Sequence, residues 1–148
     1  MLRIAKLTDY ATVLMVRMAR EPAQYFSAAQ LADELGLPPP TVAKLLKRLL
    51  LGGLLTSVRG AVGGYTLAHA PHAISVADVV NAIEGPLALT ECSLGKGNCS
   101  LENDCATRAN WQFISHAVRV ALEAVSLADM ALPRMQTIRM PGLKEKAP

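Results

Sequence analysis

The chain has 148 residues, 51% of them hydrophobic, and its 15 basic and 12 acidic side chains give a net charge of +3. This length fits one ordinary domain, or one small domain with an appendage, and is enough to form a hydrophobic core without disulfide bonds. Three cysteines exclude a fully paired disulfide framework. The sequence shows no apolar run of the ~20 residues that a membrane span needs and no signal peptide, so we expect a cytoplasmic protein that binds no membrane.

The first two predicted helices carry clear local signals. Thr8 is a good N-cap for a helix over residues 8–21. Ser27 with Gln30 has the spacing of a capping box and opens a second helix. Gly36 is expected to end that helix as a C-cap.

A third helix and a hairpin follow. The helix is predicted over residues 40–51, because prolines are tolerated only before a helix or in its first turn. Strands are predicted over 54–59 and 65–68, around a glycine-rich turn. Three helices and a hairpin in this order predict a winged helix-turn-helix over residues 1–85, within a mainly α fold.

The charge pattern indicates what this part of the chain binds. Residues 36–74 carry four basic side chains and no acidic ones, whereas residues 75–129 carry three basic and seven acidic ones. A merely solvated surface usually mixes both signs, so an all-cationic stretch favours binding to double-stranded DNA. The helix predicted over residues 40–51 would fit the major groove of DNA. The glycines would let the backbone of the wing approach the duplex closely. The candidate DNA-binding residues are Thr41, Lys44, Lys47, Arg48, Arg59, Gly60, Gly63 and Gly64.

The second half is predicted to hold a loop and a long helix. Ser75 caps a helix over 76–84. Residues 87–104 lack periodicity and are predicted to form a loop that carries Cys92 and Cys99, with Cys105 directly after it. A long helix over about 106–125 has apolar residues at steps of three and four, which favours pairing with a second copy in a homodimer. The alternative is that this stripe packs on its own domain. The stripe consists of Trp111, Ile114, Val118, Ala121 and Val125.

This pattern divides the chain beyond residue 85 into three regions. We expect a ligand-binding loop over 86–105, a dimerisation helix region over 106–132 and a flexible tail over 133–148.

The cysteines suit a metal centre. Cys92, Cys99 and Cys105 are spaced C-x6-C-x5-C near Gly95 and Gly97. Zinc ligands are usually closer in sequence, whereas an iron–sulfur cluster needs more reach between its thiolates. Three cysteines leave a tetrahedral ligand set one short, and three unrelated thiols remain an alternative.

Taken together, these residues resemble the iron–sulfur winged-helix regulators typified by IscR and NsrR. The resemblance covers about residues 1–132: the opening Lys6–Ala11, the wing run Val58–Tyr65, the three cysteines and Trp111 are all similar to family motifs. The first ten residues are most similar to regulators of the SUF iron–sulfur assembly operon. Ala61-Val62 departs from the Pro-Gly that is common in the family's wing.

The resemblance implies a homodimeric DNA-binding transcription factor with a 2Fe–2S or 4Fe–4S cluster held by Cys92, Cys99 and Cys105. Cluster occupancy would change its affinity for promoter DNA, and it would act as a repressor of cluster assembly genes. An NsrR-type nitric oxide sensor is the alternative within the family.

The resemblance also implies a fourth ligand. In IscR a histidine three residues after the last cysteine serves, but here that position is Arg108, which stays protonated and cannot ligate. The NsrR branch uses an aspartate near the N-terminus of the other subunit, and Asp9 matches it. An acidic side chain in the first turn of a helix is also stabilised by the helix dipole, so capping is an alternative role for Asp9. Weaker candidates are His116, Glu91 and Glu102.

Two other classes of protein are weighed against a regulator. A cluster carrier with a vestigial winged helix, or a zinc-stabilised interaction module, would show no specific DNA binding. The cationic stretch argues against the carrier, and the zinc module would be a colourless protein with zinc bound. An enzyme is not expected, because the sequence shows no recognisable nucleophile–base pair or paired carboxylates.

Overall fold

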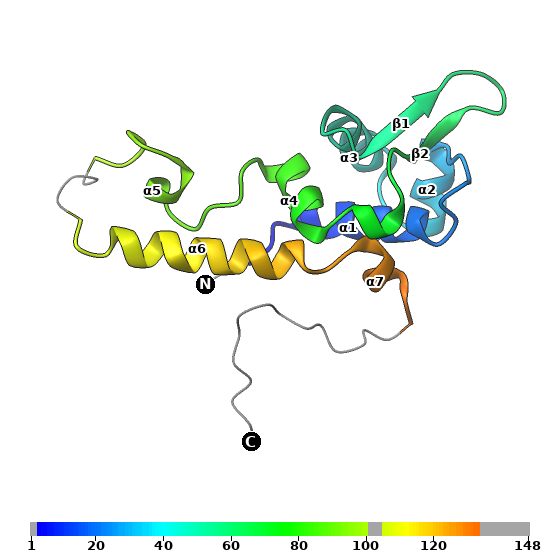
Figure 1. The fold of residues 1–148 in the computed structure, drawn as a ribbon. Coiled ribbons are helices and arrows are strands. Elements are labelled where there is room, and N and C mark those ends of the chain that lie inside the picture. The colour runs from blue at the N-terminus through cyan, green and yellow to red at the C-terminus, as the bar shows by residue number, and fades with distance from the viewer. Residues whose placement is uncertain (1–2, 101–104, 134–148) are drawn as a thin grey trace.

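The computed structural model describes residues 3–100 and 105–133, so Glu102 and the predicted tail from residue 134 lie outside the described residues. Its elements in chain order are α1 (Lys6–Ala19), α2 (Ala28–Leu35), α3 (Pro39–Leu51), β1 (Leu55–Val58), β2 (Gly64–Leu67), the 3-10 turn η1 (Pro71–Ala73), α4 (Val76–Glu84), α5 (Glu91–Leu94), α6 (Arg108–Glu123) and α7 (Leu127–Ala131). Figure 1 shows a body formed by α1–α4, the hairpin and α7. From this body α6 extends as a rod, with α5 beside its far end. This is the predicted mainly α winged helix-turn-helix.

The helix-turn-helix forms from local signals: the cap at Ser27 and the C-cap at Gly36 are confirmed, whereas the reciprocal half of the predicted capping box is not formed. The Ser27 hydroxyl accepts a hydrogen bond from the Gln30 backbone at 3.0 Å and caps α2. The Gln30 side chain bonds Glu34 instead of closing the box. Gly36 adopts a left-handed φ of 62°, and the Leu37 N–H reaches the carbonyl of Ala32 at 3.0 Å, as in a Schellman turn. This turn sets the direction in which α3 begins.

The start of α1 differs from the prediction. The helix begins at Lys6 with Ala5 as N-cap, so Thr8 is not a cap. Thr8 is instead fully buried, and its hydroxyl donates a hydrogen bond to the Glu84 carboxylate at the end of α4. A buried hydroxyl requires a partner. Thr8 therefore links α1 to α4 and does not mark the start of a helix.

The wing is an antiparallel hairpin that pairs Leu55 with Leu67. β2 also pairs with Phe26, through two backbone hydrogen bonds between Phe26 and Tyr65 of 2.8 and 2.9 Å. A side chain at Gly64 would lie 2.6 Å from the Phe26 carbonyl oxygen, and one at Gly63 would lie 2.2 Å from the Val58 carbonyl oxygen. The hairpin's own packing therefore requires these glycines, whatever their role at DNA.

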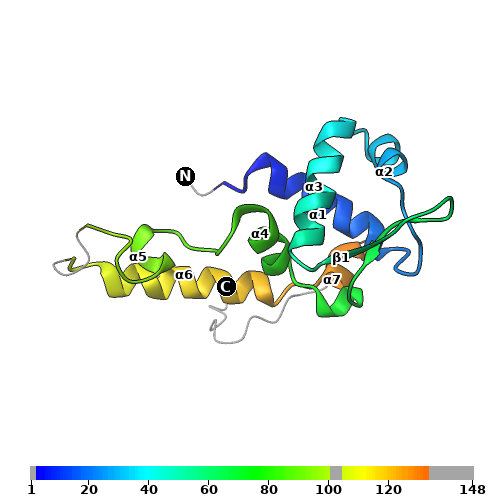
Figure 2. The same cartoon turned by 90° about the horizontal axis from the view of Figure 1, so that it is seen from above.

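Two capping boxes organise the second half. Ser75 and Asp78 cap α4 reciprocally, and Ser126 and Asp129 cap α7 in the same way. Because α7 returns to pack on α1, the chain re-enters the body after α6. Figure 2 shows α6 running out from the body, and Figure 1 shows α7 below α1. No helix in residues 3–100 and 105–133 is long and apolar enough to cross a membrane.

Two predictions for this half are wrong in detail. The segment over 87–104 contains the short helix α5, which is too short to show periodicity. The long helix ends at Glu123, so Val125 lies beyond it. Val125 is only 8% exposed and packs against Val76 and Val80 of α4. Its apolar surface is therefore largely covered within its own chain.

Candidate DNA interface and cysteine segment

α3 presents a cationic side to solvent. Its inner face is fixed because Val42, Leu45, Leu46 and Leu49 are fully buried. Lys44 and Lys47 are exposed three residues apart, and Thr41 is half-buried one turn earlier. Neither lysine forms an ion pair or hydrogen bond with any described residue. The structure thus brings these three predicted residues onto one helix, with both charges free for phosphates.

The wing adds a second cationic element. Arg59 follows β1 and is exposed, and Val62 at the tip is 92% exposed. Gly60 has a φ of 126°, a conformation that side chains rarely adopt. In both Figure 1 and Figure 2 the hairpin and α3 lie at the end of the body away from α5. A duplex could contact both elements without touching residues 86–105 of the same chain, which carry the cysteines and are called the cysteine segment below.

Arg48 differs from the other predicted DNA-binding residues. It is half-buried, and its Nη1 donates a hydrogen bond of 2.7 Å to the backbone carbonyl of Ile83 in α4. The last carbonyls of a helix lack intrahelical donors, and a cation there is favoured by the helix dipole. The prediction that Arg48 faces outward is therefore corrected, because its guanidinium faces α4.

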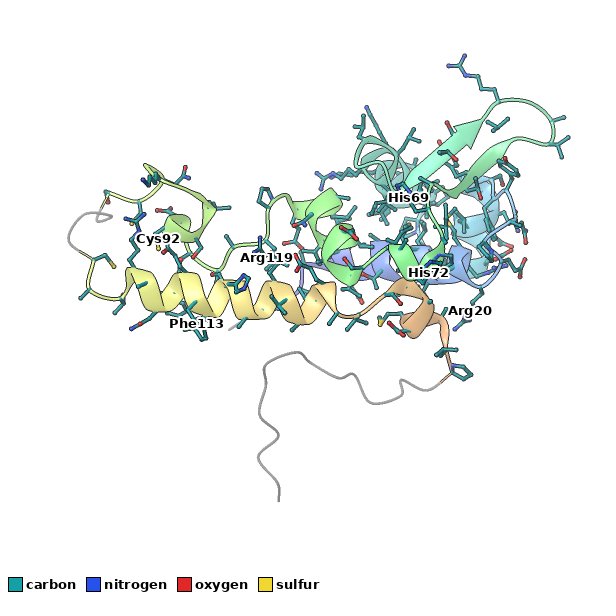
Figure 3. The ribbon with its side chains drawn as sticks, in the orientation of Figure 1. Arg20, His69, His72, Cys92, Phe113 and Arg119 are labelled. Atoms are coloured by element: carbon teal, nitrogen blue, oxygen red, sulfur yellow. The ribbon has the colours of Figure 1, made fainter. Side chains whose placement is uncertain are left out.

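The cysteine segment is attached to α6 by polar contacts. Figure 3 shows Cys92, a residue of α5, beside α6. The Gln112 amide donates to the Cys92 carbonyl at 3.2 Å. The buried Ser115 hydroxyl donates to Ser93 at 3.1 Å and accepts from the Leu89 backbone at 3.2 Å. Sequence analysis missed these polar residues, although Gln112 and Ser115 share one helix face by their spacing.

The three thiols have different environments. Cys92 is buried, Cys99 and Cys105 are half-buried, and all three are free. The pKa of the Cys105 thiol is lowered from its ordinary value, first by the hydrogen bond from the Thr107 hydroxyl and next by the Thr107 backbone N–H. The Cys105 sulfur lies 3.5 Å from that hydroxyl oxygen. A lowered pKa favours the thiolate, which is the form that binds metal.

The predicted fourth ligands do not join the cysteines within one chain. Among the described residues, no three histidine, cysteine or carboxylate side chains meet at a point that could hold one metal ion. Asp9 is exposed on α1, and Figures 1 and 2 show α5 at the far end of α6 from α1. Glu91 is exposed at the start of α5. His116 is exposed on α6, where its Nδ1 lies 3.0 Å from the Arg119 guanidinium. A contribution from Asp9 would therefore require a second subunit.

Large apolar side chains of α6 are exposed to solvent. Trp111 is 42% exposed, Phe113 is 73% exposed and Ile114 is 41% exposed. Phe113 points away from α5 (Figure 3). Trp111 and Ile114 belong to the predicted seam, whereas Phe113 falls outside the heptad pattern and was missed. Several large apolar side chains exposed along one helix are typical of an interaction surface.

Residues 4–132 match the model of the Rrf2 family, which is described as iron-dependent transcriptional regulators. The chain belongs to the Rrf2 family. An HTH-type regulator of Azotobacter vinelandii, ORF2, is 30% identical over 95% of this chain and 90% of its own. The HTH-type transcriptional regulator IscR of Escherichia coli is 29% identical over 87% of this chain and 80% of its own.

Solved structures agree with this assignment. CymR, the global cysteine regulator of B. subtilis, matches with a TM-score of 0.70 and 30% identity over 88% of this chain and 97% of its own. IscR of T. potens matches with a TM-score of 0.66 and 29% identity over 87% and 85%. This Rrf2 protein is therefore an IscR-like helix-turn-helix transcriptional regulator that binds DNA, and it is not an enzyme. That result removes the alternatives that lacked DNA binding.

Proposed function

We propose that this Rrf2 protein is a homodimeric repressor whose affinity for promoter DNA depends on an iron–sulfur cluster, and that it controls genes of cluster assembly. The observation that carries the proposal is the set of three free thiols on a segment attached to α6 of an IscR-like regulator. A regulator of transcription works where the DNA is, which agrees with the cytoplasmic location expected from the sequence.

The chemistry of the donor set fits an iron–sulfur cluster. Cys92, Cys99 and Cys105 would supply thiolates, and Asp9 of the partner subunit would supply a carboxylate. The lowered pKa of Cys105 supports this role. When bound, the cluster supplies a redox- and iron-responsive group. Because a carboxylate is a more exchangeable iron ligand than a thiolate, the predicted set suits a sensor. The chain's own residues hold the segment against α6.

Dimerisation is supported by the exposed face of α6. A second copy would cover Trp111, Phe113 and Ile114, which are otherwise exposed to water. Two subunits would also present two copies of α3 to two half-sites. The division into a DNA-binding region over 1–85, a cluster segment over 86–105 and a dimerisation region over 106–132 is part of this proposal.

Anaerobic purification followed by DNA binding tests the proposed function. We expect brown protein with iron and sulfide, and a dimer by sedimentation. We also expect an operator, selected from a random-sequence DNA pool, to bind with different affinities before and after cluster removal. Colourless protein that carries zinc after reconstitution would contradict the proposal, as would equal affinities in the two states.

The physiological signal separates two versions of the function. Control of SUF-type assembly genes predicts an operator upstream of those genes, whereas the NsrR-type alternative predicts an operator upstream of nitric oxide detoxification genes. The same fold also occurs in CymR, which is described as a global cysteine regulator. Metal content therefore has to be measured before promoters are assigned.

Asp9→Ala is expected to shorten the lifetime of the cluster in air at least several-fold, because the variant removes the proposed fourth ligand. The fold should survive, because an exposed acid in a first helical turn contributes only about 0.3–1 kcal/mol. Asp33→Ala, which removes an exposed acid from α2, is the matched control. Equal bleaching rates in both variants, followed by visible absorbance, would leave Asp9 with a helix-dipole role alone.

A further inference from the structure

The side chain of Arg48 connects the DNA-facing helix to the helix that leads into the cysteine segment. Arg48 lies in the last turn of α3, and its hydrogen bond ends on the carbonyl of Ile83, in the last turn of α4. The Ile83 side chain is itself buried in the main core. The guanidinium therefore holds two helix ends together.

Close backbone packing reinforces this junction. Gly52 ends α3 with an ordinary right-handed φ of −75°, so it is not needed for its backbone conformation. A side chain there would lie 2.7 Å from the Cβ of Ala82. Gly52 is therefore required for space, and α3 touches α4 at the residue next to the Arg48 contact. A displacement of the α4 end has to move α3 or break the hydrogen bond.

The same end of α4 leads directly to the cysteines. Glu84 is the last residue of α4 and accepts the hydrogen bond from buried Thr8. Gly85 then turns the chain with a φ of 90°. Leu87 is tied back to α4 by its N–H, which donates to the Asn81 side chain at 3.1 Å. The chain from there reaches Cys92 within five residues, with no intervening element.

From this connectivity we propose that Arg48 is a coupling residue: it transmits the state of the cysteine segment from the end of α4 to α3, and does not bind DNA. The proposal rests on the cluster-dependent DNA binding proposed above. Movement of the segment shifts the last turn of α4, and the Arg48–Ile83 hydrogen bond makes α3 follow.

The test compares Arg48→Met with Lys44→Met, which removes one exposed charge from the same helix. The affinity for the selected operator is measured with and without the cluster at several salt concentrations. For Arg48→Met we expect the ratio between the two states, about 5-fold or more in the wild type, to fall toward one. Its salt dependence should stay unchanged. For Lys44→Met we expect the same ratio and a slope of log K against log salt lower by about 2 per dimer.

A second variant and a second measurement distinguish a loss of coupling from misfolding. Arg48→Lys keeps a donor for the Ile83 carbonyl and should recover part of the ratio. Hydrogen exchange gives a second readout: in the wild type, cluster removal should change protection in both α4 and α3, and in Arg48→Met it should change protection in α4 alone.

The outcomes separate the two proposals. A wild type with equal affinities in both states overturns the proposed function, and the coupling with it. A wild type with a clear ratio that Arg48→Met retains overturns the coupling alone. A lowered salt slope in Arg48→Met would show that Arg48 contacts phosphate after all.

Discussion

Cys99→Ala is expected to abolish the visible absorbance of the anaerobically purified protein and to remove nearly all of its iron and sulfide. Cys99 is one of three thiols in the proposed ligand set, and alanine offers no ligand atom in its place. Cys99 is a better choice than Cys92, because Cys92 is buried against α6 and its removal would also disturb packing. Absorbance, iron and sulfide per chain provide the measurement.

The neighbouring residue provides a matched control. Ser100 is exposed in the same segment, so Ser100→Ala changes the segment without removing a thiol. Its spectrum should equal that of the wild type. With the cluster removed from all three proteins, both variants should have a free energy of unfolding within about 0.5 kcal/mol of the wild type, because neither residue contributes to the main core. A wild-type spectrum for Cys99→Ala would exclude Cys99 from the site.

The double variant Lys44→Ala/Lys47→Ala is expected to lose most of its affinity for the operator. Each lysine is exposed on α3 without a partner among the described residues, so each is free to contact a phosphate. A dimer would lose four contacts, and the slope of log K against log salt should fall by roughly 4, because each phosphate contact contributes about 0.9. Titrations at several salt concentrations measure this slope.

A control with the same change in charge separates contact from general electrostatics. Arg20 and Lys96 are both exposed, and Figure 3 shows Arg20 on the side of the body away from the hairpin. Arg20→Ala/Lys96→Ala should therefore keep the wild-type slope. If the slope of log K against log salt fell equally in both double variants, the net charge of the protein and not contacts from α3 would account for DNA binding.

The sequence predicted those parts of the fold that depend on neighbouring residues. Ser27, Gly36 and Ser75 mark helix ends by hydrogen bonds within a few residues, and the glycines of the wing mark a hairpin. Thr8 was misjudged because its role is decided by Glu84, 76 residues away. Propensities describe the local chain and not its tertiary partners.

The site was predicted in its residue types and only partly in its geometry. Lys44, Lys47 and Arg59 are exposed, as the pattern indicated. Arg48 and Val125 fit the same helical periodicities, but contacts with α4 turn both of them inward. The docking of α5 on α6 depends on single polar hydrogen bonds, which leave no periodic signal. The assembly of the predicted cluster ligands stays a prediction, because Asp9 would come from a second chain.

The main core has a consequence for how such regulators diversify. Its buried residues come from α1 to α4, the hairpin and α7, and none of the described residues between Ile83 and Leu127 contributes to it. The cysteine segment and α6 thus lie between two elements of a body that folds around other side chains. Selection can replace the cysteines of the segment or its attachments while the DNA-binding body keeps its packing. A single ancestral body can in this way acquire different inputs, and regulators with different signals can share one architecture.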